Sequence, residues 1–194
     1  MDNKMKIIDN KYVFIGSYPQ NGTEKEPIKW RILKKEDDIL TLISDVILFN
    51  DDFDINYSEY RISKIRKIIL EQFIPFAFTL EEQKLILDTQ LEDVCDKVYI
   101  PSLEDMKIIE RSERIRKVTP YAISTKASHY PAYTKKELPL KDNGWYWTRT
   151  PYKPPYDPTR YNHVWYISYN GSIEERNVWG YDIGVVLMMR VKLK

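Results

Sequence analysis

Cysteine, histidine and glycine are scarce in this chain of 194 residues. The single cysteine, Cys95, excludes an internal disulfide, and with only His129 and His163 beside it a Cys/His zinc site cannot reach four ligands. The six glycines are too dispersed to form a phosphate-binding loop or a dinucleotide-binding fingerprint. We therefore expect no metal site and no cofactor. Neither histidine lies in a nucleophile motif, so no catalytic residue is assigned.

Long apolar runs and an excess of charge of one sign are also missing. No stretch of about 18 apolar residues occurs that would span a membrane. The first residues lack the apolar segment and the cleavage site of a signal peptide. The 30 basic and 29 acidic residues give a formal net charge of +1, so no general field attracts nucleic acid or acidic lipid. These absences predict a cytoplasmic protein, with neither a membrane nor nucleic acid as its expected partner.

The first fifty residues show the pattern of β-strands. Short β-rich runs cover 12–18, 28–33 and 39–44, and turn-forming residues separate them. Connections this short favour antiparallel neighbours. The sequence therefore predicts a three-stranded antiparallel meander.

Helix signals dominate the middle of the chain. Isoleucines and Phe73 recur at helical spacing over 62–73, with basic residues mostly between them, which predicts an amphipathic helix of about three turns. A capping-box pattern at Thr79 predicts a second helix beginning at Leu80, and Ser102 begins a looser version of the same pattern. Pro120 stands at a first helical position. One short strand is expected between Asp96 and Ile100.

The C-terminal third returns to β structure. Asn170-Gly171 between the runs 163–169 and 172–179 predicts a hairpin with a two-residue type I′ turn. That turn would place Trp165 opposite Arg176, close enough for a cation–π contact. The apolar run 185–189 predicts one strand that is covered on both faces. No linker divides the chain, so we expect a single α+β domain over residues 1–194, with antiparallel sheets and flanking helices.

Asp52, Asp54 and Asn56 resemble the opening of a calcium-binding loop, because oxygen ligands recur at alternate positions. The resemblance fails further on, where Tyr57 replaces the required glycine and Ser63 replaces the bidentate glutamate. A solvated acidic loop is the better interpretation.

Two basic clusters occur, at 61–67 and 111–117. Both are interrupted by isoleucines at helix-compatible spacing, which favours solvated helix faces over phosphate contacts. Cys95 is surrounded by carboxylates that would raise a thiol pKa, so we expect a packed or spectator cysteine.

The unusual feature is a concentration of aromatic residues, with 11 in the 37 residues from Trp145 to Tyr181. Core packing is the favoured interpretation for Trp145, Trp147 and Trp165. Tyr152, Tyr156 and Tyr161 on the proline-rich loop 152–161 would instead present flat, amphipathic surface to a sugar, a peptide or a base, and the two interpretations are evenly balanced for them. The candidate ligand-binding residues are Arg149, Tyr152, Tyr156, Arg160, Tyr161 and His163.

Several segments together resemble a bacterial domain of unknown function, the one numbered 6273. In order along the chain, the segments that carry this resemblance are 15–20, 27–33, 63–69, 77–83, 96–102 and 145–151. The resemblance covers about residues 12–193. The chain departs from the family pattern at its end, where Gly184-Val185-Val186-Leu187-Met188 replaces a common Gly-Val-Arg-Pro-Ala ending.

This family is similar in layout to C-type-lectin-like domains and to sulfatase-modifying oxidases. The resemblance therefore implies an α+β fold in which the N- and C-terminal strands share a sheet and helices flank it. The oxidase activity would need paired cysteines, and the calcium-dependent sugar motif Glu-Pro-Asn of true lectins is missing, so neither activity is implied.

The sequence supports a non-enzymatic binding module that presents an aromatic, proline-rich loop to a protein, a peptide or a glycan. Two alternatives remain open. An enzyme would need convergent polar groups in a pocket, for example His163 with Glu175 or with Arg149. A nucleic-acid-associated protein would need both basic clusters on one face.

Overall fold

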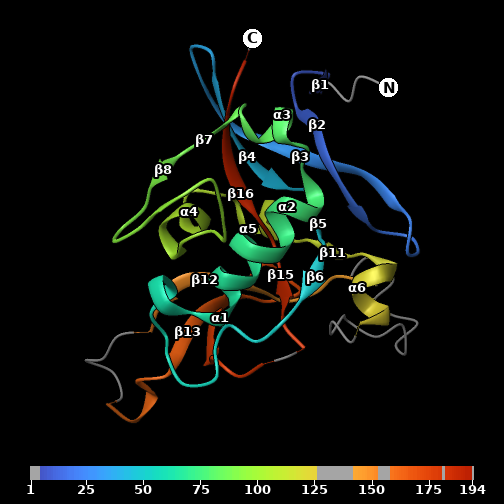
Figure 1. Ribbon diagram of the computed structural model, residues 1–194. Helices are drawn as coiled ribbons and strands as arrows, with labels where there is room; N and C mark the ends of the chain where they lie inside the picture. The colour runs from blue at the N-terminus through green and yellow to red at the C-terminus, as the bar shows by residue number, and fades with distance from the viewer. Residues whose placement is uncertain (1–4, 126–141, 153–157, 181, 194) are drawn as a thin grey trace.

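The computed structural model describes residues 5–125, 142–152, 158–180 and 182–193, and two large sheets dominate it (Figure 1). One sheet has seven strands and the other has five, and short helices lie beside them. This is the α+β class that the sequence predicts, in one compact domain. Among the helices in these ranges, none has the length and apolarity needed to cross a bilayer.

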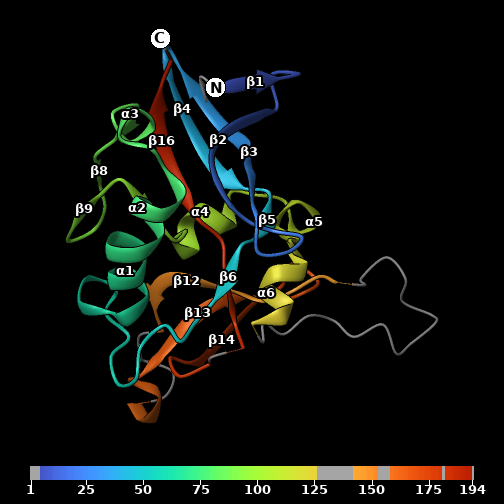
Figure 2. The ribbon, with the colours of Figure 1, turned by 45° about the vertical axis from the view of Figure 1, so that its right-hand side comes forward.

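The seven-stranded sheet contains both the first and the last strand of the chain. Its order is β1-β2-β3-β4-β16-β10, β7 also pairs with β16, and every pairing is antiparallel. The predicted meander and the predicted sharing of one sheet by β2 and β16 are confirmed, and both termini lie at the same end of the molecule (Figures 1 and 2). The strands are β1 (Lys6–Ile8), β2 (Tyr12–Pro19), β3 (Lys25–Glu36), β4 (Ile39–Ser44), β7 (Ile86–Leu87), β10 (Val98–Tyr99) and β16 (Met188–Lys192).

The five-stranded sheet holds the aromatic part of the chain, in the order β14-β13-β12-β15-β6. The single strand expected over 185–189 is two strands, because the chain leaves this sheet after β15, passes through the buried Val186 and Leu187, and enters the other sheet as β16. Burial of the whole run is as predicted. The strands are β6 (Phe49–Asn50), β12 (Tyr146–Pro151), β13 (His163–Ile167), β14 (Ile173–Asn177) and β15 (Gly184–Val185).

Two pairs of short strands complete the β structure. β5 (Val46–Ile47) pairs in parallel with β11 (Lys117–Val118). β8 (Thr89–Gln90) and β9 (Cys95–Asp96) form a small antiparallel hairpin. The single strand expected over 96–100 is thus divided between β9 and β10.

Three helices, α3 (Leu80–Gln83), α4 (Leu103–Lys107) and α6 (Pro120–Ser124), begin at the capping and proline signals read from the sequence. A 3-10 turn, η1 (Tyr60–Ile62), precedes a continuous helical segment made of α1 (Lys64–Ile68), the π-helical turn η2 (Ile69–Phe73) and α2 (Ile74–Ala77). Pro75 has no N–H for an α-helical bond, which fits the widened turn before it. Both capping boxes are present. The other helical elements are α5 (Arg111–Arg114) and η4 (Pro158–Arg160).

The predicted register of the β13–β14 hairpin is wrong. Trp165 lies opposite Glu175, and Arg176 lies opposite Val164, so the expected contact between Trp165 and Arg176 does not form. The reason is the turn: Gly171 is left-handed at φ +79°, but Asn170 is not. Hydrogen bonds from Gly171 N to the Ser168 carbonyl and from Ser168 N to the Ser172 carbonyl, at 2.8 and 2.9 Å, close a three-residue loop instead.

One expectation about exposure is also corrected. Arg116, placed on a solvated helix face by its sequence, is only 1% exposed, and its Nε donates to the Ser44 carbonyl at 3.1 Å. Burial lowers the pKa of this guanidinium. Of the two possibilities left open for Cys95, packed or spectator, the structure excludes the packed one: Cys95 is exposed at the start of β9.

Candidate functional site

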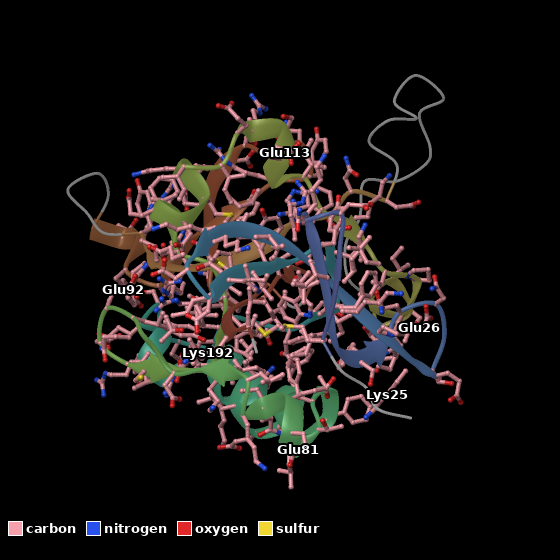
Figure 3. The ribbon with its side chains drawn as sticks, turned by 90° about the horizontal axis from the view of Figure 1, so that it is seen from above. Lys25, Glu26, Glu81, Glu92, Glu113 and Lys192 are labelled. Carbon is pink, nitrogen blue, oxygen red and sulfur yellow. The ribbon has the colours of Figure 1, made fainter. Side chains whose placement is uncertain are left out.

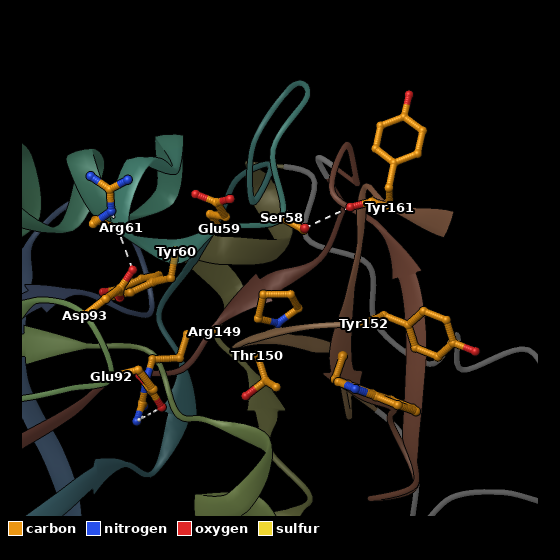
Figure 4. Close-up of a pocket in the computed structure, with 12 residues that line it drawn as sticks. Ser58, Glu59, Tyr60, Arg61, Glu92, Asp93, Arg149, Thr150, Tyr152 and Tyr161 are labelled. Carbon is orange, nitrogen blue, oxygen red and sulfur yellow. Dashed lines mark hydrogen bonds and ion pairs between the residues drawn. The ribbon is translucent and has the colours of Figure 1, made fainter. Parts of the chain in front are cut away.

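A pocket of about 860 Å³ lies where four distant parts of the chain meet (Figure 4). The turn 58–61 forms one wall, and the tip of the β8–β9 hairpin, Glu92-Asp93, forms another. The end of β12, residues 149–152, lines it together with Tyr161 and Trp165. A volume of this size is typical of sites that bind small molecules or short chain segments.

The carboxylate of Asp54 fixes the backbone that leads into the turn 58–61. Its Oδ1 accepts hydrogen bonds from the backbone N–H groups of Asn56 and Tyr57, at 2.8 and 3.0 Å, and its Oδ2 accepts from the N–H of Lys64 at 2.9 Å. Burial acts to raise the pKa of Asp54, but these hydrogen bonds outweigh it, so the pKa lies below its usual value. The residues that resemble a calcium loop thus form a backbone turn. Within the described ranges, no cluster of three or more His, Cys, Asp and Glu residues is suited to a metal ion.

Two hydrogen bonds attach this segment to the aromatic sheet. The buried indole of Trp147 on β12 donates from Nε1 to the Asp51 carbonyl at 2.9 Å. The Ser58 hydroxyl donates to the Tyr161 carbonyl, also at 2.9 Å. These two hydrogen bonds hold together segments that lie 96 and 103 positions apart in the sequence.

Arg149 forms the floor of the pocket. The pairing of β12 with β13 shifts register between Trp147 and Pro151, and Arg149 N–H bonds instead to the Pro101 carbonyl at 2.8 Å. The guanidinium is 8% exposed, and it bonds Glu92 through two nitrogens, at 2.8 and 3.1 Å. Its Nη1 donates to the Ile100 carbonyl at 2.9 Å and to Asp105 at 3.0 Å.

The electrostatics of the floor follow from these contacts. Burial acts to raise the pKa of Glu92, but the hydrogen bonds from Arg149 outweigh it and hold this pKa below its usual value. Burial acts to lower the pKa of Arg149, and its bonds to Glu92 and Asp105 raise it instead. The Arg149 charge is thus shared between two carboxylates, Glu92 and Asp105.

Aromatic rings make the remaining wall. Tyr152 and Trp165 meet edge to face, with ring centroids 5.1 Å apart, and Tyr161, which is 71% exposed, also lines the pocket. Trp147 belongs to the core, as the sequence predicts, whereas Trp165 is half-buried and reaches the pocket. Tyr60 is buried under the floor, and burial raises the pKa of its hydroxyl.

A second pocket of about 330 Å³ continues the first, and the two share three residues. The shared residues are Ser58, Glu59 and Tyr161, two of which make the hydrogen bond described above. The second pocket adds polar side chains that hydrogen-bond in both directions, from Asn56, Tyr57 and Asn162. We call the two pockets together the groove; the hydrogen bond between Ser58 and Tyr161 crosses it between the two pockets.

The six predicted ligand-binding residues fall into two groups. Arg149, Tyr152 and Tyr161 line the larger pocket. Arg160 and His163 both contact the carboxylate of Glu175 instead. Tyr156 lies outside the described residues.

The residues named for the two alternative functions lie outside the groove or form ion pairs beside it. His163 and Glu175 do meet, but neither is among the described residues that line the groove. The cations of the first basic cluster face carboxylates: Arg61 lies 3.5 Å from Asp93, and Arg66 lies 2.8 Å from Asp96. These ion pairs partly neutralise the first cluster.

Several pocket residues carry no signal in the sequence. Glu59, Glu92 and Asp93 are ordinary surface residue types, and only the fold brings them to Arg149 and Tyr152. Trp165 alternates with His163 along β13, so both side chains lie on one face of the sheet.

The comparisons with known proteins identify a family and nothing closer. The model of the family described as Domain of unknown function (DUF6273) matches residues 37–193, so the resemblance noted over 12–36 lies outside the match. No curated protein and no solved structure matches the chain.

Proposed function

Because the chain belongs to the DUF6273 family, whose description assigns no activity, we propose its function from the geometry of the groove: it is a non-enzymatic binding module for a protein segment, a peptide or a glycan. The observation that carries this proposal is the pocket of about 860 Å³ walled by Tyr152, Trp165 and Tyr161.

The chemistry of the wall suits reversible binding. Tyrosine and tryptophan offer large amphipathic surfaces and lose little conformational entropy when a ligand covers them. Trp165 is also held by its edge-to-face contact with Tyr152, so these two rings are ordered before a ligand arrives. Preorganised rings of this kind increase affinity because less ordering is needed on binding.

The shape of the groove suits a chain rather than a compact molecule. The second pocket continues the first beyond the Ser58–Tyr161 bridge, and it is lined by amide and hydroxyl groups. A peptide or an oligosaccharide that crosses the bridge would stack on aromatic rings on one side and hydrogen-bond on the other.

Two finer expectations belong to the same proposal. The C-type-lectin-like architecture is supported by β2 and β16 in one sheet with helices beside it. The family resemblance suggests a bacterial origin, and the sequence composition suggests a cytoplasmic location. Cell fractionation with an antibody against the chain tests the location.

The binding proposal is tested with arrays of defined peptides and glycans, followed by titration of each hit. Tyr161→Ala and Tyr152→Ala are expected to weaken binding by about tenfold or more, as is usual for central interface tyrosines. Trp179→Ala is the matched control, because Trp179 is also exposed, at 62%, and lines neither pocket. Hits that lose affinity equally in all three variants, or in none, would contradict the proposal.

A further inference from the structure

The groove has more negative than positive charge. Three carboxylates line the larger pocket, from Glu59, Glu92 and Asp93, against the two guanidinium groups of Arg61 and Arg149. Both guanidinium groups are already paired, Arg149 with Glu92 at 2.8 Å and Arg61 with Asp93 at 3.5 Å. One carboxylate therefore remains without a cation.

That carboxylate belongs to Glu59. Its oxygens make no hydrogen bond or ion pair with any residue that the structure describes, while its neighbours Ser58 and Arg61 both have partners. Glu59 is exposed, belongs to the turn 58–61 (Figure 4), and lines both pockets. Any chain that occupies the groove passes this charge.

The aromatic rings nearby favour the same kind of ligand. The face of a tyrosine or tryptophan ring is electron-rich and attracts a cation within about 6 Å of its centroid. Tyr161 lines both pockets together with Glu59, and Tyr152 and Trp165 line the larger one. A ligand that lies along the groove would thus meet both the Glu59 carboxylate and aromatic ring surface.

We infer that the groove selects an extended peptide with a positively charged side chain, a lysine or an arginine, and that Glu59 pairs with this cation. The inference rests on the proposed binding function and names its ligand class. A neutral glycan would cover Glu59 with hydroxyl groups alone, and neutral hydrogen bonds compensate a desolvated carboxylate less well than an ion pair does. The groove charge therefore favours the peptide.

The test uses three capped heptapeptide libraries with identical random flanks of glycine, serine, alanine and tyrosine. Their central residue is fixed as lysine, norleucine or glutamate, and binding to the full chain is followed by calorimetry. The lysine library is expected to bind about tenfold tighter than the norleucine library, because norleucine keeps the chain length but lacks the charge. This advantage should shrink as salt is raised from about 0.05 M to about 0.5 M.

Two variants separate the cation from the rest of the groove. Glu59→Gln is expected to lower affinity for the lysine library to that for norleucine, without changing the norleucine value. Glu24→Gln is the matched control, since Glu24 is also exposed and precedes Lys25, which lies on the opposite side of the molecule from Glu92 (Figure 3). It should change neither affinity.

The possible failures can be told apart. Equal binding of lysine and norleucine libraries, lost in Tyr161→Ala, would overturn the cation inference and leave the binding function in place. If a neutral trisaccharide binds, no peptide binds, and Tyr161→Ala abolishes the binding, the cation inference is also overturned and the binding function stays in place. Lysine binding that survives both Glu59→Gln and Tyr161→Ala would place the cation elsewhere and overturn the inference. No binding of any library or array ligand would overturn both.

Discussion

Replacing Arg149 by alanine should destabilise the fold through the floor of the pocket. The guanidinium is 8% exposed and bonds Glu92, Asp105 and the Ile100 carbonyl. Removing one partner of a buried ion pair costs about 3–5 kcal/mol, because the other charge is left without compensation. Glu92 is 62% exposed, so water compensates its share, and Asp105 and Ile100 account for most of the loss. We therefore expect a loss of about 3 kcal/mol, at the lower end of that range.

Arg61→Ala is the matched control, because Arg61 also pairs with a carboxylate at the same pocket. Its partner Asp93 is 3.5 Å away, and the two side chains are 53% and 54% exposed. Pairs of this kind contribute less than about 1 kcal/mol. Arg149→Lys should fall between the two alanine variants, since it keeps the charge and loses the two-pronged contact with Glu92.

The assay is urea unfolding at neutral pH, followed by tryptophan fluorescence, with the dependence on urea checked for each variant. A lower midpoint with an unchanged slope reports lost stability alone. If Arg149→Ala and Arg61→Ala unfold within about 1 kcal/mol of each other, the buried contacts of Arg149 do not hold the floor together and the reasoning fails.

Three further predictions concern other parts of the chain. Gly171→Ala should lower the free energy of unfolding by about 1–3 kcal/mol or more, because Gly171 is left-handed and an added Cβ would lie 2.1 Å from the Arg111 carbonyl oxygen. Gly22→Ala is the control: an added Cβ there has nothing within 4 Å, so this variant should be neutral or stabilising in the same urea assay. Asp54→Asn should lower the free energy of unfolding at pH 7 by about 1.5–3 kcal/mol. Since folding lowers the Asp54 pKa, the wild-type advantage is present above the unfolded pKa of about 3.9 and disappears as the pH falls through the folded pKa. An equal difference in stability between wild type and variant at pH 3 and pH 7 would contradict this prediction. Cys95 is exposed and should react with Ellman's reagent in native buffer at a rate within about tenfold of that in urea; a thiol that reacts only after unfolding would show that it is packed.

Local chemistry was enough to predict most elements of the fold. Thr79 and Ser102 begin helices because their side chains accept hydrogen bonds from the N–H groups of Glu82 and Asp105, a pattern visible within four residues of sequence. The register of the β13–β14 hairpin was not predictable in the same way. It depends on whether Asn170 joins Gly171 in the left-handed region, and a three-residue loop moves every cross-strand pair by one position.

The candidate site was predictable only in part, because its contacts are long-range. Arg149 and Glu92 are 57 positions apart, and Ser58 and Tyr161 are 103 apart. An aromatic cluster is visible in composition, which is why Tyr152 and Tyr161 were found. The carboxylates opposite them belong to separate turns, and no local pattern distinguishes these acidic residues from others on the surface.

The way Arg149 is anchored explains why the groove can exist before a ligand binds. The Asp105 carboxylate that contacts Arg149 also accepts hydrogen bonds from the Ser102 N–H and hydroxyl, at 2.7 and 2.8 Å, and thereby caps α4. The same guanidinium donates two hydrogen bonds to Glu92 at the tip of the β8–β9 hairpin. A helix, a hairpin and the end of β12 are thus joined at one buried charge. Because Glu92 and Asp105 are already paired with Arg149, the Glu59 carboxylate and the rings of Tyr152, Tyr161 and Trp165 are left to interact with a ligand, and binding there needs little rearrangement of the fold.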